Sequence, residues 1–287
     1  MNVVFIGSGN VAVSLSFALY RAGHTITQVW SRSKHAANQM LETLHANGCN
    51  NTITAICQWE DVRADADLYV VAVTDEAVAM VAQALATVWQ ANASLPARKR
   101  ICVHTACTLP YQVLEPLQPF AQIGVLYPFQ TFTKSRMIDV SNVPFFIEGD
   151  NDSTTTVLKQ LAAELSTIVY QSDLQMRMYL HLAGVMAGNF TNCLYAMAKD
   201  ILSQANLPFE LLFPIIDETA QKVHTIPPRS AQTGPAVRGD QQTINNHLKI
   251  INTDDLRELY ILFTRNIQES TSVNKPNPSS ESLLKSR

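Results

Sequence analysis

Charged residues and long apolar runs are both scarce in this chain of 287 residues. Charged side chains make up 16% of the sequence and the formal net charge is -3, whereas nucleic-acid binders usually carry a basic stripe. No apolar run reaches the roughly 18 residues that can span a bilayer. The first apolar stretch, Val3 to Ile6, also lacks the preceding basic segment of a signal peptide. We therefore expect a cytoplasmic protein with no nucleic-acid partner and no membrane partner.

Cysteine is sparse as well. There are five cysteines, an odd number, and no two of them form a CxxC pair. We interpret them as reduced thiols and mostly as small buried apolar groups, and we expect no metal site. They are Cys49, Cys57, Cys102, Cys107 and Cys193.

The first part of the chain alternates short β-type runs with helical patterns. This alternation predicts right-handed βαβ units and a mostly parallel, doubly wound sheet, which is an α/β fold. Predicted strands are Asn2–Ile6, Thr25–Trp30, Leu68–Val73, Arg100–His104, Gln122–Leu126, Pro144–Ile147 and Thr167–Tyr170, and predicted helices include Val11–Ala22, Glu76–Gln90 and Thr154–Ser166.

The pattern changes near Ser172. Leu174–Gln204 has the composition of one long apolar helix, and no strand pattern follows it. We predict further helices over Pro208–Val223 and from Thr253 to about Ser270, separated by a loop rich in proline, glycine and threonine. The expected organisation is an α/β domain at 1–172, an all-helical domain at 173–270 and a disordered tail at 271–287.

A glycine motif lies directly after the first predicted strand and directly before the first predicted helix. In that context it is typical of a dinucleotide-binding turn. Gly7 permits the tight turn, Gly9 lets a pyrophosphate approach the backbone, and Ala12 lets the helix pack closely on the strand. The alternative is a glycine turn that binds no ligand. The motif reads Gly7-Ser8-Gly9-Asn10-Val11-Ala12, and we expect all six residues to border the cofactor.

The end of the second predicted strand distinguishes NADP from NAD. NAD sites usually carry an acidic residue there, about 20 residues past the glycines, to bind the ribose hydroxyls. This chain has Ser31, Arg32 and Ser33 instead. A guanidinium and two hydroxyls suit the 2′-phosphate of NADP, so NADP is the expected cofactor. Ser33 can also cap the following helix.

Two more strand ends carry polar residues that are expected at the same edge of the sheet. Val73, Thr74 and Asp75 would border the ribose or the nicotinamide, although Asp75 could be only a helix cap. His104 is the candidate proton donor or orienting group, because its ordinary pKa suits proton transfer. A hydrogen-bonded structural histidine is the alternative. The segment Tyr127–Thr131 would add a wall and an amide to the same cleft.

The helical half supplies further candidates. His181, Asn189 and Asn192 fall near one face of the long helix, where they would bind substrate or nicotinamide or pack against other helices. Arg238 would hold an anionic group of the substrate, with Asp240 beside it. An ordinary Arg–Asp turn is the alternative for that pair.

Several motifs together resemble a known family. The segments FIGSGNVA, VAVTDEAV, VHTA, YPFQTF, HLAGVMAGNFTN and TGPAVRGD occur in this order. They are similar to a poorly characterised family in which a Rossmann-like domain precedes a helical domain, and whose members are commonly named NADP oxidoreductases. Its layout is similar to that of pyrroline-5-carboxylate reductase and of the 6-phosphogluconate and β-hydroxyacid dehydrogenases. The resemblance implies a helical domain that dimerises and an active site in the cleft between the domains.

One departure separates this chain from β-hydroxyacid dehydrogenases. Those enzymes carry a catalytic lysine one helical turn before an asparagine, but here Val185 and Gly188 stand four residues before Asn189 and Asn192. Two hypotheses about function remain. One is an NADP(H)-dependent oxidoreductase that acts on a small polar carbonyl or imine substrate, and the other is a non-catalytic NADP(H)-binding redox sensor. A homodimer is expected in either case, because the long helix is too apolar for one small domain to bury.

Overall fold

The computed structural model describes residues 1–92 and 100–273, with side chains described up to residue 270. Contacts divide the chain into two compact units, one from Met1 to Asn189 and the other from Phe190 onward. The predicted disordered tail lies outside the described residues, except that 271–273 continue the last helix.

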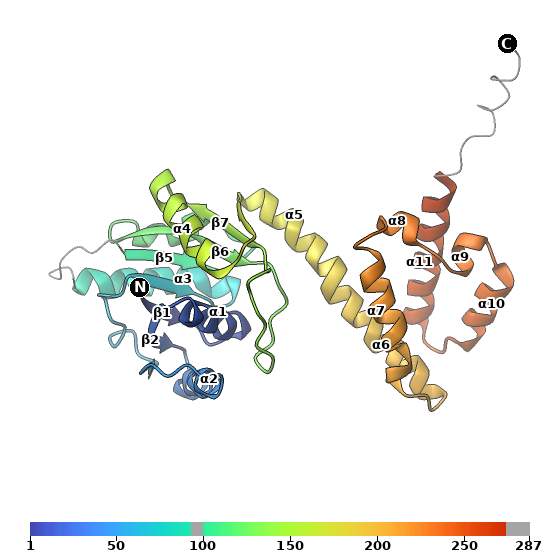
Figure 1. The fold of residues 1–287 in the computed structure, drawn as a ribbon, viewed down its shortest axis with the longest axis horizontal. Helices are drawn as coiled ribbons and strands as arrows, with labels where there is room; N and C mark the ends of the chain where they lie inside the picture. Colours follow the sequence, from blue (N-terminus) through green and yellow to red (C-terminus); the bar gives the residue numbers. More distant parts are fainter. Residues whose placement is uncertain (93–99, 274–287) are drawn as a thin grey trace, which may run out of the picture. The chain divides into compact units, whose positions relative to one another are not determined.

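The first unit is built on one eight-stranded sheet in the order β3-β2-β1-β4-β5-β6-β7-β8 (Figure 1). Strands β1 to β6 pair in parallel, β7 is antiparallel to β6, and β8 is parallel to β7. The predicted doubly wound, mostly parallel sheet is thereby confirmed. The strands are β1 (Asn2–Ile6), β2 (Thr25–Trp30), β3 (Thr54–Ile56), β4 (Leu68–Val71), β5 (Arg100–His104), β6 (Ala121–Pro128), β7 (Phe145–Gly149) and β8 (Val169–Gln171).

Helices cover both faces of this sheet because successive side chains of a strand point to opposite faces. In β1, Val3 and Phe5 belong to one apolar cluster, and Val4 and Ile6 belong to the other. The first cluster is covered by α1, α2 and α4, and the second by α3 and the 3-10 helix η1. The bounds are α1 (Asn10–Arg21), α2 (Lys34–Ala46), α3 (Asp75–Ala91), η1 (Tyr111–Leu117) and α4 (Asp152–Leu165).

The chain reverses its winding direction between β1 and β4. From β1 the chain winds outward to β2 and β3, and then crosses back to β4 on the other side of β1. Ligands of doubly wound sheets bind outside the carboxyl ends of the strands at such a reversal point. We therefore expect a ligand site at the loops that follow β1 and β4.

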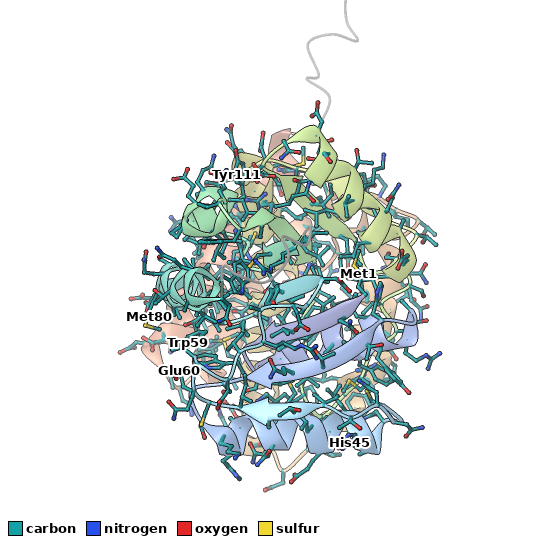
Figure 2. All side chains as sticks on the ribbon, turned by 90° about the vertical axis from the view of Figure 1, so that its left-hand side faces the viewer. Met1, His45, Trp59, Glu60, Met80 and Tyr111 are labelled. Carbon is teal, nitrogen blue, oxygen red and sulfur yellow. The ribbon has the colours of Figure 1, made fainter. Side chains whose placement is uncertain are left out.

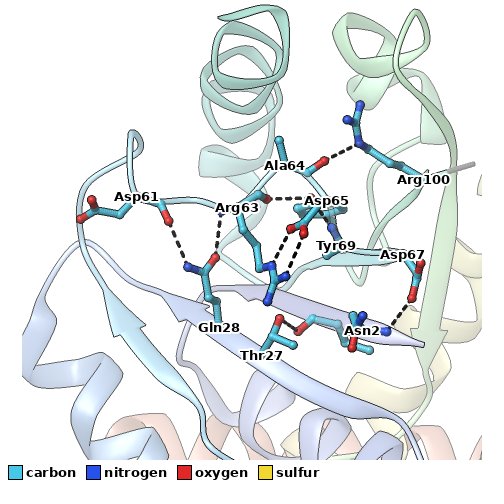
Figure 3. Close-up of polar contacts among 12 residues, drawn as sticks. Asn2, Thr27, Gln28, Asp61, Arg63, Ala64, Asp65, Asp67, Tyr69 and Arg100 are labelled. Atoms are coloured by element: carbon cyan, nitrogen blue, oxygen red, sulfur yellow. Dashed lines mark hydrogen bonds and ion pairs between the residues drawn. The ribbon is translucent and has the colours of Figure 1, made fainter. Parts of the chain in front are cut away.

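A polar network lies at the other end of the strands, where their amino ends meet the crossover segment (Figure 3). The Asn2 amide donates to Asp67 at 2.7 Å, and Arg100 Nε donates to the Ala64 carbonyl at 2.7 Å. The Tyr69 hydroxyl donates to the Arg63 carbonyl at 2.7 Å. These bonds fix the crossover segment between β3 and β4 at the amino ends of the strands, which leaves the carboxyl ends for function.

The predicted long helix is present but interrupted. Helix α5 (Leu174–Gly184) continues through a π-helical segment, η2 (Val185–Phe190), into α6 (Thr191–Gln204). The first unit extends to Asn189, and Arg177 of α5 is fully buried within it.

The described part of the second unit is helical throughout. No helix in the described ranges combines the length and apolarity that a membrane span needs. The sequence analysis predicted neither the short strand β3 nor helix α10, and the short helices α8 and α9 lie where it predicted a loop. The elements after α6 are the 3-10 helix η3 (Phe209–Leu212), α7 (Phe213–Lys222), α8 (Pro228–Ala231), α9 (Pro235–Arg238), α10 (Gln241–Ile250) and α11 (Asp254–Val273).

Candidate dinucleotide site

The turn between β1 and α1 needs glycine at one position for steric reasons. Gly7 has a φ of 119°, and a Cβ added to it would lie 2.1 Å from the Ala72 carbonyl oxygen. Its amide donates to the Trp30 carbonyl at 2.8 Å. Gly7 therefore seats the turn against the ends of both neighbouring strands, β2 and β4.

Gly9 has a different role. It is the N-cap residue of α1, with an ordinary φ of -76° and no capping side chain. A Cβ added there would meet nothing within 4 Å, so the backbone faces open space. A helix N-terminus with free access suits an anionic phosphate. Ala12, one turn later, is fully buried in the core beneath the helix.

This turn opens into a cavity of about 590 Å³, here called the first cavity. Most of the residues predicted to bind the cofactor line it, but Ala12 and Ser33 do not. Ala12 packs in the core, and Ser33 is the N-cap of α2, accepting from the Ala36 amide. The predicted residues in the lining are Gly7, Ser8, Gly9, Asn10, Val11, Ser31, Arg32, Val73, Thr74 and Asp75.

The end of β2 forms one side of the first cavity. The Ser8 hydroxyl donates to the Ser31 hydroxyl at 3.1 Å, which ties the glycine turn to this strand end. Arg32 is exposed in the lining, and no described residue forms an ion pair or hydrogen bond with its guanidinium. A cation next to two hydroxyls is thus available to an anionic ligand.

Aromatic and apolar side chains extend this wall. Trp30 is 4% exposed and stacks on Trp59 with ring centroids 3.9 Å apart. Its buried indole N–H has no hydrogen-bond partner among the described residues. Met80 projects from α3, where it is 56% exposed (Figure 2). Neither Trp30 nor Met80 was predicted, because apolar residues carry no motif.

The loop after β5 forms the opposite wall. Thr105, Cys107 and Thr108 line the first cavity, and the Thr108 hydroxyl donates to the Asp75 carboxylate. These three residues follow a strand end, which is the signal that singled out Thr74 and His104. They were nevertheless not included among the predicted site residues.

His104 does not line the first cavity. It is fully buried, its Nδ1 accepts from the Ala106 amide at 3.2 Å, and its Nε2 lies 3.2 Å from the Pro110 carbonyl oxygen. These partners define a neutral ring that donates from Nε2. Burial lowers the pKa of His104 to about 4. Because both ring nitrogens are engaged, this environment favours an orienting or structural histidine over a proton donor.

Arg177 holds the same loop from the side of α5. Its Nη2 donates to the Leu109 carbonyl at 2.9 Å and its Nε to the Cys107 carbonyl at 3.4 Å. In return, the Cys107 thiol donates to the Arg177 carbonyl at 3.1 Å. The helix and the cavity wall are therefore fixed to each other, and His181 stands one turn further along α5.

A second cavity of about 380 Å³ adjoins the first. Tyr127 and His181 line both cavities. The predicted residue Asn189 lies in the second cavity only. Its other lining residues are Phe129, Gln130, Thr131, Gly184, Val185, Ala187 and Gly188.

Three predicted site residues belong to the second unit. Asn192 is exposed on α6. Arg238 ends the short helix α9, and Asp240 caps α10 by accepting from the Thr243 amide at 3.0 Å and the Thr243 hydroxyl at 2.7 Å. These two bonds hold the pKa of Asp240 below its usual range. The capping contacts account for Asp240 without a ligand.

Within residues 1–92 and 100–270, no group of three or more His, Cys, Asp or Glu side chains is arranged to hold a metal ion. All five cysteines are free thiols.

The order of the strands and the geometry of the glycine turn define a Rossmann-like fold. Residues 1–127 match the Rossmann-like domain family, and residues 143–267 match the domain of unknown function DUF2520. No curated protein matches the chain. A crystal structure of a "putative NADP oxidoreductase" from Bacteroides fragilis is 38% identical, with a TM-score of 0.82 over 93% of this chain and 98% of that chain.

The chain therefore belongs to the same family as the Bacteroides fragilis protein, which confirms the resemblance drawn from the motifs. More distant structures share the fold. A Plasmodium falciparum pyrroline carboxylate reductase with NADP bound is 11% identical, with a TM-score of 0.56 over 94% of this chain and 98% of that chain. A Streptomyces aurantiacus imine reductase is 13% identical, with a TM-score of 0.59 over 94% and 96%.

Proposed function

We propose that this protein is an NADP(H)-dependent oxidoreductase that acts on a small polar carbonyl or imine substrate. The observation that carries the proposal is the first cavity, in which the open backbone of Gly9 and the guanidinium of Arg32 line one space. The name of the Bacteroides fragilis relative and the NADP bound to the Plasmodium falciparum structure support the same cofactor.

The residues of the first cavity fit a dinucleotide. The N-terminus of α1 would take the pyrophosphate, because its amides and dipole favour an anion. Ser31 and Arg32 would hold the 2′-phosphate, because a planar guanidinium and a hydroxyl are donors to phosphate oxygens. Val73 and Thr74 would border the ribose or the nicotinamide. When bound, the cofactor supplies or accepts the hydride.

His104 acts in this proposal as a positioning residue. Its Nε2–H holds the Pro110 carbonyl, and its Nδ1 holds the Ala106 amide. Together these bonds shape the loop that carries Thr105, Cys107 and Thr108 into the cavity wall.

The second unit supports a homodimer. Its buried apolar side chains within residues 190–270 are Ala236 and Ile244 alone, which is too little for an independent core. Large apolar side chains such as Leu211, Ile215 and Leu262 are about 60% exposed. A second copy of the chain would cover them. Light scattering at micromolar protein should give twice the monomer mass, and a monomer would contradict the dimer.

Turnover tests the enzymatic part of the proposal. Oxidation of NADPH should be followed with a panel of aldehydes, ketones and imines, some uncharged and some carrying a carboxylate. Hydride transfer to at least one member is expected. Tight NADPH binding without any transfer would instead favour the non-catalytic redox sensor.

A further inference from the structure

The two cavities of the first unit meet at a pair of titratable side chains. Tyr127 ends β6 and His181 lies on α5, and both line both cavities. In the proposed function, the first cavity binds the dinucleotide. A group that reacts with that dinucleotide must reach it from the adjoining space, which is the second cavity.

The walls of the second cavity carry amides rather than charges. Its lining residues are all described, and none of them is Arg, Lys, Asp or Glu. Gln130 Oε1 already accepts from the Thr131 amide at 2.8 Å, so the Gln130 amino group is left to donate. Asn189 provides a second amide on the π-helical segment. These partners match an uncharged polar group, and none of the lining side chains is an Arg or Lys that would pair with a carboxylate.

Tyr127 places its hydroxyl group at the junction. The hydroxyl donates to the Cys107 sulfur, because the Cys107 thiol hydrogen is itself donated to the Arg177 carbonyl at 3.1 Å. Burial raises the pKa of Tyr127 well above its ordinary value, and the neighbouring Cys107 and Asp75 act in the same direction. The phenol is therefore protonated at neutral pH and held in place. His181 faces the same junction from α5.

We propose that the second cavity is the substrate site, that it takes an uncharged ketone or cyclic imine, and that Tyr127 donates the proton during reduction. This inference rests on the proposed function. The acceptor carbon takes the hydride, and the π-electron pair of the C=O or C=N bond moves to the heteroatom. The Tyr127 hydroxyl turns from the Cys107 sulfur to the heteroatom and gives it the proton, and the phenolate regains a proton from solvent. The acceptor is reduced and the dinucleotide is oxidised by the same two electrons.

Filling the second cavity tests its occupant. Gly188 tolerates a side chain, because a Cβ there would meet only Thr131 Cγ2 at an ordinary 3.8 Å. Gly188→Leu should abolish reduction of the substrate and leave the rise in melting temperature with NADPH unchanged. The control is Ala183→Leu on the exposed part of α5 outside both cavities, which should keep both properties. Full turnover in Gly188→Leu would overturn the placement of the substrate.

Paired acceptors test the charge preference. Cyclohexanone and pyrroline should each be compared with the same ring bearing a carboxylate. We expect kcat/KM at least about tenfold higher for the uncharged member, because the lining offers a carboxylate no counter-charge; tenfold corresponds to about 1.4 kcal/mol. A preference for the carboxylated rings would overturn this inference alone, because hydride transfer would still have occurred. No transfer to any acceptor would overturn the proposed function as well.

Tyr127→Phe and His181→Gln separate the two candidate donors. Loss of a general acid lowers kcat by about 10²- to 10⁴-fold, and we expect this loss in Tyr127→Phe with unchanged NADPH binding. A tyrosine donor predicts a kcat that is flat between about pH 6 and 8, because its raised pKa lies above that range. If Tyr127→Phe keeps its kcat and His181→Gln loses it instead, then Tyr127 is not the donor.

Discussion

Arg177 Nη1 lies 2.5 Å from Glu148 Oε2, joining helix α5 to strand β7. The Arg177 side chain is fully buried and that of Glu148 is 20% exposed. Because the same guanidinium also holds the Cys107 and Leu109 carbonyls, this ion pair sets the position of α5 beside the cavities.

Removing Glu148 should destabilise the first unit strongly. Glu148→Ala leaves the buried Arg177 without its counter-charge, which typically costs about 3–5 kcal/mol. Urea unfolding at pH 7 measures the loss. Glu164→Ala is the matched control, because Glu164 is half exposed in its pair with His24 and should contribute at most about 1 kcal/mol. Equal effects of the two changes would contradict the role of Arg177.

Alanine at the two glycines of the turn should have opposite consequences. Gly7→Ala should lower the melting temperature without any ligand, because of its positive φ and the Ala72 carbonyl. Gly9→Ala should melt like the wild type without ligand, yet lose the stabilisation by NADPH, because its methyl group would occupy the space for phosphate. Normal NADPH binding by Gly9→Ala would mean that the turn holds no pyrophosphate.

Arg32 should determine the preference of the protein for NADPH over NADH. Charge-assisted hydrogen bonds contribute about 1.5–3 kcal/mol, so Arg32→Ala should weaken NADPH binding by about 10- to 100-fold and leave NADH binding unchanged. Calorimetric titration gives both constants. Arg136→Ala, at an exposed arginine outside the cavity, serves as the control for net charge. If Arg32→Ala weakens the binding of NADPH and NADH equally, Arg32 does not bind the 2′-phosphate.

His104 should make stability dependent on pH. Its pKa is lowered to about 4 from 6.5. Between these two pH values the histidine is protonated in the unfolded chain but neutral in the native protein. The stability contributed by the neutral ring is present above about pH 6.5 and is lost as pH falls toward 4, by about 3 kcal/mol in all. Urea unfolding of wild type and His104→Asn between these limits should show a steeper decline in the wild type. Parallel curves would contradict the burial of His104.

The parts of the fold that depend on local pattern could be predicted from the sequence. Strand β4 and helix α1 follow from continuous and periodic apolar residues, and the glycine turn between β1 and α1 follows from its own spacing. Strand β3 was missed because three residues at a sheet edge give almost no pattern. Helix α10 was missed because its polar sequence shows no apolar face until Ile244 is seen to be buried.

The parts of the candidate site that directly follow strand ends could be predicted from the sequence. Ser31, Arg32 and Thr74 follow strand ends, and parallel strands bring their carboxyl ends to one edge. The environment of His104 could not be read from the sequence, because burial and the bonds to Ala106 and Pro110 depend on the course of a loop. The junction at Tyr127 and His181 also depends on tertiary packing, since it exists only because Arg177 anchors α5.

The most direct test of the account is a parallel titration with NADPH and NADH, followed by melting temperature. A ligand that binds the folded state stabilises it by roughly 2.7 kcal/mol at a hundredfold excess over Kd. A large rise with NADPH and little rise with NADH is the predicted result. No rise with either nucleotide would mean that the glycine turn is only structural, and it would contradict the proposed oxidoreductase.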